Sequence, residues 1–296
     1  MNNILKITSI FMLLGVLISS CSSDEETSTA TFELNINGLE DLGDNFIYEG
    51  WIIVDGAPVT TGTFEVSSDG TLSQTEFAVS EESLEAATTF VLTIEPSPDP
   101  SPEPSDVHIL AGDFSGNSAD LTVDHGAAIG ENFVDAAGGY ILATPTDGGS
   151  DTDENSGVWW LNPAAGPGAG LDLPVLPSGW IYEGWAVVDG TPISTGRFTS
   201  VTGSDDFNGY SGDQSGPAFP GEDFLSNAPE GFDFPVDLAG KTVVISVEPV
   251  PDNSPAPFTL KPLVGPVDEA AVDHFFYDMI NNASNTNPTG SINRNL

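Results

Sequence analysis

An internal repeat constrains most strongly what this chain of 296 residues can fold into. Residues 46–64 align without gaps to residues 180–198, and twelve of these 19 positions are identical. A second block, residues 95–112, aligns to residues 248–265 with nine of 18 positions identical. The offset grows from 134 to 153 between the blocks, so the second copy carries 19 extra residues. We therefore expect two tandem copies of one domain.

Each copy has the pattern of β-structure. Residues 46–54 form an apolar-rich segment of strand length, and Asp55–Gly56 and Asp189–Gly190 then mark tight hairpin turns. Residues 90–94 and 243–247 are nearly continuous runs of apolar and β-branched side chains, which is typical of buried strands. Strands are therefore expected on both sides of each turn and again after it.

Proline punctuates both copies at equivalent places, in residues 96–104 and 249–257. Such segments exclude helices and central strands and predict rigid loops that cross between sheets. We predict an all-β fold with two tandem β-sandwich domains, residues 32–138 and 139–280. The remaining residues, 281–296, are expected to form a polar, frayed tail.

The N-terminal segment has the pattern of an export signal. Lys6 precedes an apolar run, residues 7–18, which is shorter than the about 20 residues that a membrane span needs. Leu17-Ile-Ser-Ser-Cys21 follows, and it resembles the lipobox of bacterial lipoproteins. The resemblance implies removal of residues 1–20 and lipidation of Cys21. The alternative is an ordinary secretory signal with an incidental cysteine.

Residues 21–31 are mostly polar and lack aromatic side chains, so we expect the lipidated Cys21 to be followed by a flexible tether. The acidic run Asp24-Glu-Glu26 resembles the surface-export signal of Bacteroidetes lipoproteins. That resemblance implies a lipid-anchored protein of the outer membrane, exposed at the cell surface. The alternative is a solvated tether without a sorting role. Because Cys21 is the only cysteine, lipidation leaves none for disulfides, metals or catalysis.

The charge of the chain limits its partners. Five Lys and Arg oppose 45 Asp and Glu, which gives a formal net charge of −40. Nucleic acids need a basic face, so they are excluded as partners. The expected partners are the membrane, through the lipid anchor, and an envelope protein or glycan whose identity the sequence does not give.

One acidic loop has a spacing that suits a metal ion. Asp151, Asp153 and Asn155 alternate between two segments that predict a hairpin, residues 140–144 and 158–161. Calcium prefers several carboxylate and carbonyl oxygens on such a loop, so these residues are a candidate Ca²⁺ site, with a plain solvated loop as the alternative. No other cofactor is expected. The extra residues of the second copy offer a further acidic group: Asp205, Asp206, Asn208 and Asp213.

Catalytic signatures are weak. The segment 212–217 resembles the nucleophile motif of trypsin-like proteases, but Gln214 separates the aspartate from Ser215 and breaks the motif. The three histidines are scattered, and His125 and His274 follow the same Val-Asp pair, which favours a structural role. We therefore expect no enzymatic activity. Four repeated aromatic residues are expected in the core rather than in a ligand groove: Tyr48, Trp51, Tyr182 and Trp185.

The repeated blocks resemble a known family. Tyr48-Glu-Gly-Trp51, Pro58-Val-Thr60 and Gly62-Thr-Phe64, then Glu95-Pro96 and Ser101-Pro-Glu-Pro104, follow the order found in the C-terminal, extracytoplasmic domain of anti-sigma-K factors. The second copy repeats most of these residues. The resemblance implies a compact β-sandwich. The chain departs from the family because it shows neither the sigma-binding helical domain nor a transmembrane helix.

Together these features predict a non-catalytic envelope lipoprotein, anchored through Cys21, that presents two β-sandwich modules for binding. The first alternative is an extracytoplasmic sensing or regulatory module related to anti-sigma factors but lacking their sigma-binding domain. The second is a hydrolase or glycan-active enzyme built on the insertion at 200–240.

Overall fold

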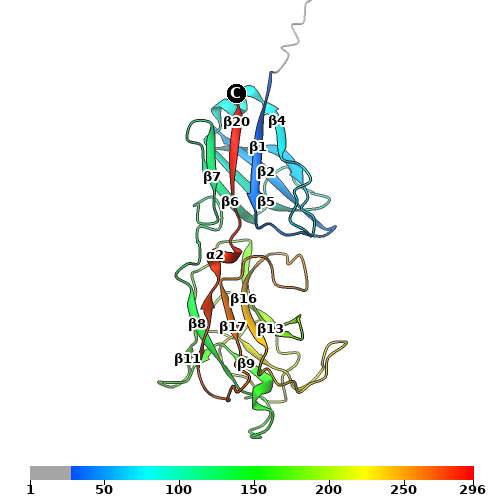
Figure 1. Cartoon of the computed structure of the whole chain (residues 1–296), viewed down its shortest axis with the longest axis vertical. Coiled ribbons are helices and arrows are strands. Elements are labelled where there is room, and N and C mark those ends of the chain that lie inside the picture. Colours follow the sequence, from blue (N-terminus) through cyan, green and yellow to red (C-terminus); the bar gives the residue numbers. More distant parts are fainter. Residues whose placement is uncertain (1–27) are drawn as a thin grey trace, which may run out of the picture.

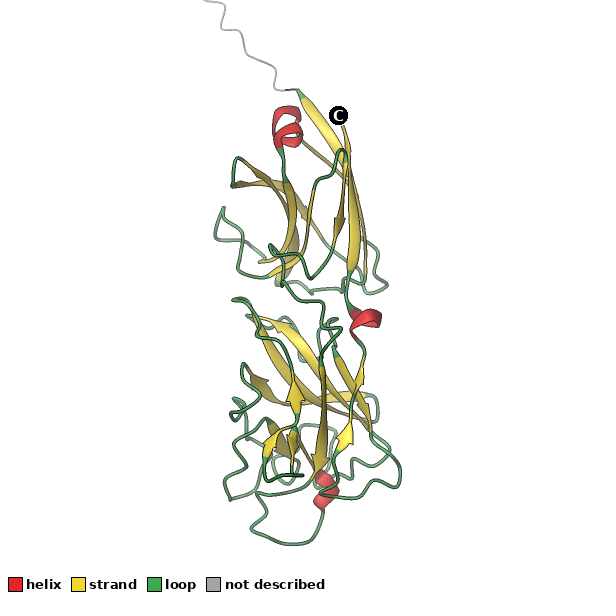
Figure 2. Ribbon diagram, turned by 90° about the vertical axis from the view of Figure 1, so that its left-hand side faces the viewer, coloured by secondary structure: helices red, strands yellow, loops and turns green. Residues whose placement is uncertain are grey.

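The computed structural model describes residues 28–296 and shows two lobes placed one beyond the other along the long axis (Figure 1). Strands dominate both lobes, and every pair of named strands is antiparallel. The predicted all-β class is therefore confirmed. Helices are short and lie at the edges of the lobes: α1 (Glu81–Ala86), η1 (Glu154–Ser156) and α2 (Ala283–Thr286) (Figure 2).

The first lobe contains two four-stranded sheets, between which an apolar core is buried. One sheet has the order β3 (Ala57–Phe64), β2 (Phe46–Val54), β5 (Thr89–Pro96) and β6 (His108–Asp113). The other has the order β4 (Glu76–Ser80), β1 (Thr29–Asn37), β20 (Thr289–Asn295) and β7 (Ser118–Leu121).

The second lobe contains a sheet equivalent to β3-β2-β5-β6, but its other sheet is built from different strands. Its repeated sheet has the order β14 (Thr191–Phe198), β13 (Trp180–Val188), β16 (Thr242–Pro249), β17 (Leu263–Pro266) and β19 (Ile280–Asn281). Its other sheet has the order β12 (Leu171–Asp172), β8 (Ala137–Leu142), β9 (Gly157–Trp159) and β15 (Gly221–Asp223), and β18 (Tyr277–Asp278) also pairs with β8. A small hairpin joins β10 (Leu161–Asn162) to β11 (Gly168–Ala169).

The sequence repeat is a structural repeat at the level of single hydrogen bonds. Strands β2 and β3 pair in the same register as β13 and β14, and both pairs have a bulge at the equivalent Gly-Trp step. The hydroxyl of Tyr48 donates to the carbonyl of Glu40, and that of Tyr182 donates to the carbonyl of Pro174, eight residues upstream in each case. Both rings are buried, as the predicted core position requires.

A second shared feature is a chain of buried hydrogen bonds that involves the glutamate before the final proline of β5 and β16, Glu95 and Glu248. The indole Nε1 of Trp185 donates to Ser246 Oγ at 2.7 Å, and Ser246 donates to Glu248. Glu248 in turn accepts the backbone N–H of Phe258 at 2.9 Å. In the first lobe Trp51, Thr93, Glu95 and Ser105 form the same chain of hydrogen bonds. Each series of hydrogen bonds attaches the end of the proline-rich loop to the sheet of its lobe. Trp51 and Trp185, which begin the two series, are both buried.

The expected frayed tail is wrong. Residues 289–295 form β20, which lies inside the sheet of the first lobe and pairs with β1 on one side and β7 on the other. Ile292 is fully buried in the core. The segment looks polar because its other side chains point away from the core or, as with Arg294, bind backbone carbonyls.

Candidate functional site

The insertion of the second copy builds the main structural difference between the repeats. It runs between β14 and β16 and contributes one strand, β15, which pairs with β9 of the opposite sheet. The corresponding segment of the first lobe contains β4 and α1 instead. The insertion is thus tied to both sheets of its lobe.

Asp223 fixes one arm of the insertion. Its side chain is fully buried and accepts the indole Nε1–H of Trp159 at 2.7 Å and the backbone N–H of Thr146 at 2.8 Å. The hydroxyl of Thr146 donates to the same carboxylate and accepts the N–H of Gly212 at 2.7 Å. Burial raises the pKa of Asp223, and the donated hydrogen bonds oppose that rise.

Glu222 holds the adjacent residue of the same arm, Ser211. Its carboxylate is fully buried, accepts the Ser211 hydroxyl and also accepts the backbone N–H of Asp223 at 3.0 Å. Burial raises its pKa to about 7. The two consecutive acids thus hold neighbouring residues of the loop, Ser211 directly and Gly212 through Thr146.

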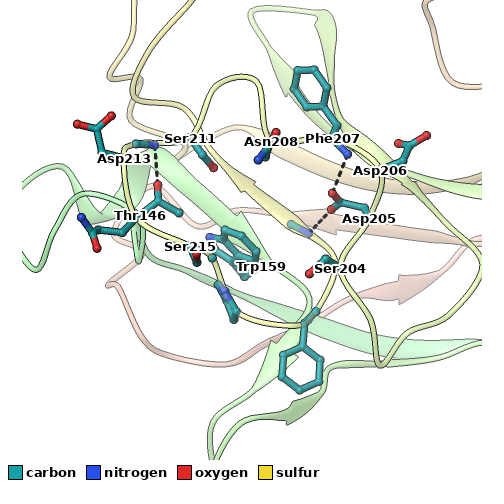
Figure 3. Close-up of a pocket in the computed structure, with 16 residues that line it drawn as sticks. Thr146, Trp159, Ser204, Asp205, Asp206, Phe207, Asn208, Ser211, Asp213 and Ser215 are labelled. Atoms are coloured by element: carbon teal, nitrogen blue, oxygen red, sulfur yellow. Dashed lines mark hydrogen bonds between the residues drawn. The ribbon is translucent and has the colours of Figure 1, made fainter.

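The fixed loop borders an open hollow of about 550 Å³ (Figure 3). Trp159 and Ser215 lie at its centre, and Ser204, Asp205, Asn208 and Ser211 surround them. The volume is within the range of small-molecule sites, about 300–1,000 Å³. The hollow is a candidate binding site because its position is defined by buried hydrogen bonds rather than by a loose loop.

Asp205 is the acid that faces this hollow. Its two oxygens accept the backbone N–H groups of Gly221 at 2.7 Å and Phe207 at 3.2 Å. Burial raises its pKa to about 6. The neighbouring Asp206 pairs with Arg197, whose guanidinium Nη2 and Nε both donate to Oδ2, at 2.9 and 3.1 Å.

The predicted calcium ligands lie elsewhere, on a second hollow of about 480 Å³. Asp151, Asp153 and Asn155 all line it, and Asp237 and Asp273 come from other parts of the chain. Within residues 28–296, however, no group of three or more His, Cys, Asp or Glu is placed to hold a metal ion. The Ca²⁺ site is therefore without support from the geometry and stays a prediction.

The structure does not assemble a catalytic serine. Ser215 lines the first hollow, whereas none of the three histidines does. His108 contacts the carbonyl of Ala127, and His274 contacts Asp273. The expected absence of enzymatic activity stays a prediction.

Sequence reasoning found the hollow only in part. It singled out Asp205, Asp206, Asn208 and Asp213, all of which line the hollow. It missed the groups beneath them, chiefly Trp159, Glu222 and Asp223. The sequence signal that could have predicted these buried acids is the pair Glu222-Asp223 directly before Phe224, since acids beside an apolar residue can belong to a buried strand.

We expect Asp223→Ala to loosen the hollow and to destabilise the protein by about 3 kcal/mol, because it leaves buried donors of Trp159 and Thr146 without an acceptor. Thermal unfolding and limited proteolysis of the 204–221 segment would measure both effects. Asp213→Ala is the control, since Asp213 is exposed and makes no hydrogen bond within residues 28–296. Equal protease resistance of the Asp223→Ala variant and the parent would contradict the anchoring role.

No helix among residues 28–296 has the length and apolar character to cross a membrane. Cys21 and the leader, residues 1–20, lie outside the described residues, so their predicted roles are untested by the structure.

Comparison with known proteins supports the family resemblance for the first repeat. The family described as anti-sigma-K factor rskA, C-terminal, matches residues 23–107. The match covers β1 to β5 of the first lobe. No curated protein and no solved structure gave a significant match.

Proposed function

We propose that the protein is a non-catalytic lipoprotein of the outer membrane, anchored through Cys21, that binds a ligand in the hollow of the second lobe. The observation that carries the binding role is the hollow itself, because two buried acids hold its loop in place before any ligand arrives. Pre-organised sites lose less conformational entropy on binding.

The anchor follows from the lipobox and from the acidic run after Cys21. In this proposal two or more acyl chains hold the protein stably, as membrane anchoring requires. The acidic run supports a position on the outer face of the outer membrane.

Replacing Cys21 with Ala is expected to release the protein from the membrane fraction and to abolish incorporation of labelled palmitate. Ser22→Ala is the control, and it should remain anchored. Protease treatment of intact cells would report surface exposure. A leader that is retained, with an unmodified Cys21 thiol in the intact mass, would refute the anchor.

The family match at residues 23–107 favours a second candidate, an extracytoplasmic regulatory module. In that role the first lobe would contact a transmembrane regulator. Co-purification of such a regulator with the anchored protein, lost on changing exposed residues of the first lobe but not of the hollow, would support this candidate over ligand binding.

A further inference from the structure

We propose that the hollow of the second lobe binds a neutral glycan, with the ring of Phe219 packing against a sugar face and the surrounding side chains bonding its hydroxyls. This inference rests on the proposed binding function and names its ligand class. It depends on which charges the hollow retains, which hydrogen-bonding groups are free, and where an apolar face lies.

The carboxylates that line the hollow do not present an unpaired charge at its centre. Both oxygens of Asp205 already accept backbone N–H groups. Asp206 is paired with Arg197, and its carboxylate points away from the centre, as does that of Asp213 (Figure 3). A cationic ligand would therefore find no free negative group at the centre.

Anionic ligands are disfavoured by the charge of the whole molecule. The chain has a net charge of −40, and its five basic residues cannot offset that field. No basic residue among residues 28–296 lines the hollow, and Arg197 is already bound to Asp206 of its lining. A sulfate, phosphate or uronic acid would be repelled, so the ligand that fits is uncharged.

The lining offers free hydrogen-bonding groups of both kinds. Ser204, Asn208, Gln214 and Ser215 line the hollow, and their side chains make no hydrogen bond to other groups within the described part of the chain. Hydroxyls and amides both donate and accept, which matches the hydroxyl groups of a sugar. Such a set of uncharged groups suits a polyhydroxylated ligand better than an apolar one.

An aromatic face completes the site. Phe219 lines the hollow and packs on the apolar cluster of Ile141, Ala143, Trp159 and Leu161, so its ring is supported by that cluster while part of the residue remains exposed. Trp159 itself is buried and serves as the floor. A supported ring beside free hydroxyls and amides is an amphipathic surface, as a sugar has apolar C–H faces and a polar edge.

The test is binding of the full mature protein, in detergent, to neutral oligosaccharides of glucose, xylose, mannose and galactose. Their sulfated and uronic-acid counterparts serve as the charged comparison. We expect at least one neutral oligosaccharide to bind in isothermal titration, and its charged counterpart to bind at least tenfold more weakly. Phe219→Ala and Asn208→Ala should each weaken the neutral ligand at least fivefold.

Two matched variants control for indirect effects. Phe275→Ala removes an exposed phenylalanine outside the hollow, and Asn117→Ala removes an exposed asparagine of the first lobe. Neither should change the affinity. Thermal unfolding of each variant checks that the fold is retained.

Three outcomes would overturn the glycan assignment: no neutral oligosaccharide binds, charged oligosaccharides bind equally well, or the Phe219 and Asn208 variants keep full affinity. Binding of a peptide or of Ca²⁺ alone that is lost in the same variants would overturn it as well, yet would leave the proposed binding function standing. An unmodified Cys21 would refute the anchor without bearing on the glycan.

Discussion

Removal of residues 288–296 is expected to unfold the first lobe, although none of these residues belongs to the repeat that builds it. Strand β20 pairs with β1 over seven positions, from Thr31–Asn295 to Asn37–Thr289, and with β7 over four. Without it the sheet would split and leave both neighbours with unpaired backbone groups. The loss would approach the total stability of a typical domain, about 5–15 kcal/mol.

Two side chains of β20 add specific contacts. Ile292 is buried in the core, and the guanidinium of Arg294 donates to the carbonyls of Leu84 at 2.6 Å and Ala87 at 3.2 Å. The same guanidinium lies 4.1 Å from the centre of the Phe114 ring. The strand is therefore held by packing and by charge as well as by its backbone.

Hydrogen exchange of the truncated protein would measure the loss directly, with protection expected to vanish in β1 and β7 and to persist in β13 and β16. A milder variant, Ile292→Ala, should cost about 2–5 kcal/mol. Its matched control is Asn293→Ala, because Asn293 is exposed on the same strand. Unchanged protection of β1 after truncation would show that β20 is dispensable.

The second large effect expected is a fall in stability as the pH rises from 5 to 8. Burial raises the pKa of Glu248 to about 8 and that of Glu183 to about 7, and the two carboxylates repel each other. Glu222 is raised to about 7 and Asp205 to about 6 by burial. Above the ordinary carboxyl values the native state therefore binds more protons than the unfolded state does.

The sign follows from this proton difference. When the native state holds more protons, the free energy of unfolding decreases with rising pH until the raised pKa values are passed. Each pKa unit corresponds to about 1.4 kcal/mol for a buried group. A net change of a few kcal/mol corresponds to a melting temperature on the order of 5–10 °C higher at pH 5 than at pH 8.

Glu248→Gln tests the origin of this slope. The amide oxygen can still accept the N–H of Phe258, but the buried group no longer ionises, so the melting temperature should vary less between pH 5 and 8. Glu103→Gln on the exposed proline-rich loop of the first lobe is the control and should keep the slope. A parent protein that becomes more stable from pH 5 to 8 would contradict the reasoning.

The sequence predicted well what local patterns determine. Residues 46–54 and 180–188 have repeated turn residues after them, and the structure places strands β2 and β13 there with matching registers. Tyr48 and Trp51 were expected in the core because they recur in both copies, and both are buried. Turn residues and apolar patterns act over a few neighbouring residues, so the strands and hairpins that they determine can be predicted from a single sequence.

Long-range pairing was not predictable in the same way. Residues 289–295 contain one large apolar side chain, Ile292, so their composition resembles that of a tail. Their strand conformation depends on β1, some 250 residues earlier in the chain. Likewise, the role of Asp223 depends on Thr146 and Trp159, which the sequence places 77 and 64 positions away.

The position of β20 has a consequence for how the protein matures. A sheet that begins at Thr29 can close only after Asn295 has been synthesised, with the whole second lobe between them. The first lobe must therefore wait, with β1 and β7 lacking the strand that joins them, until nearly the whole polypeptide has been made. A ribosome stall or a proteolytic cut near residue 288 would therefore leave β1 and β7 without their shared partner, and such a product is expected to need a chaperone or to be degraded.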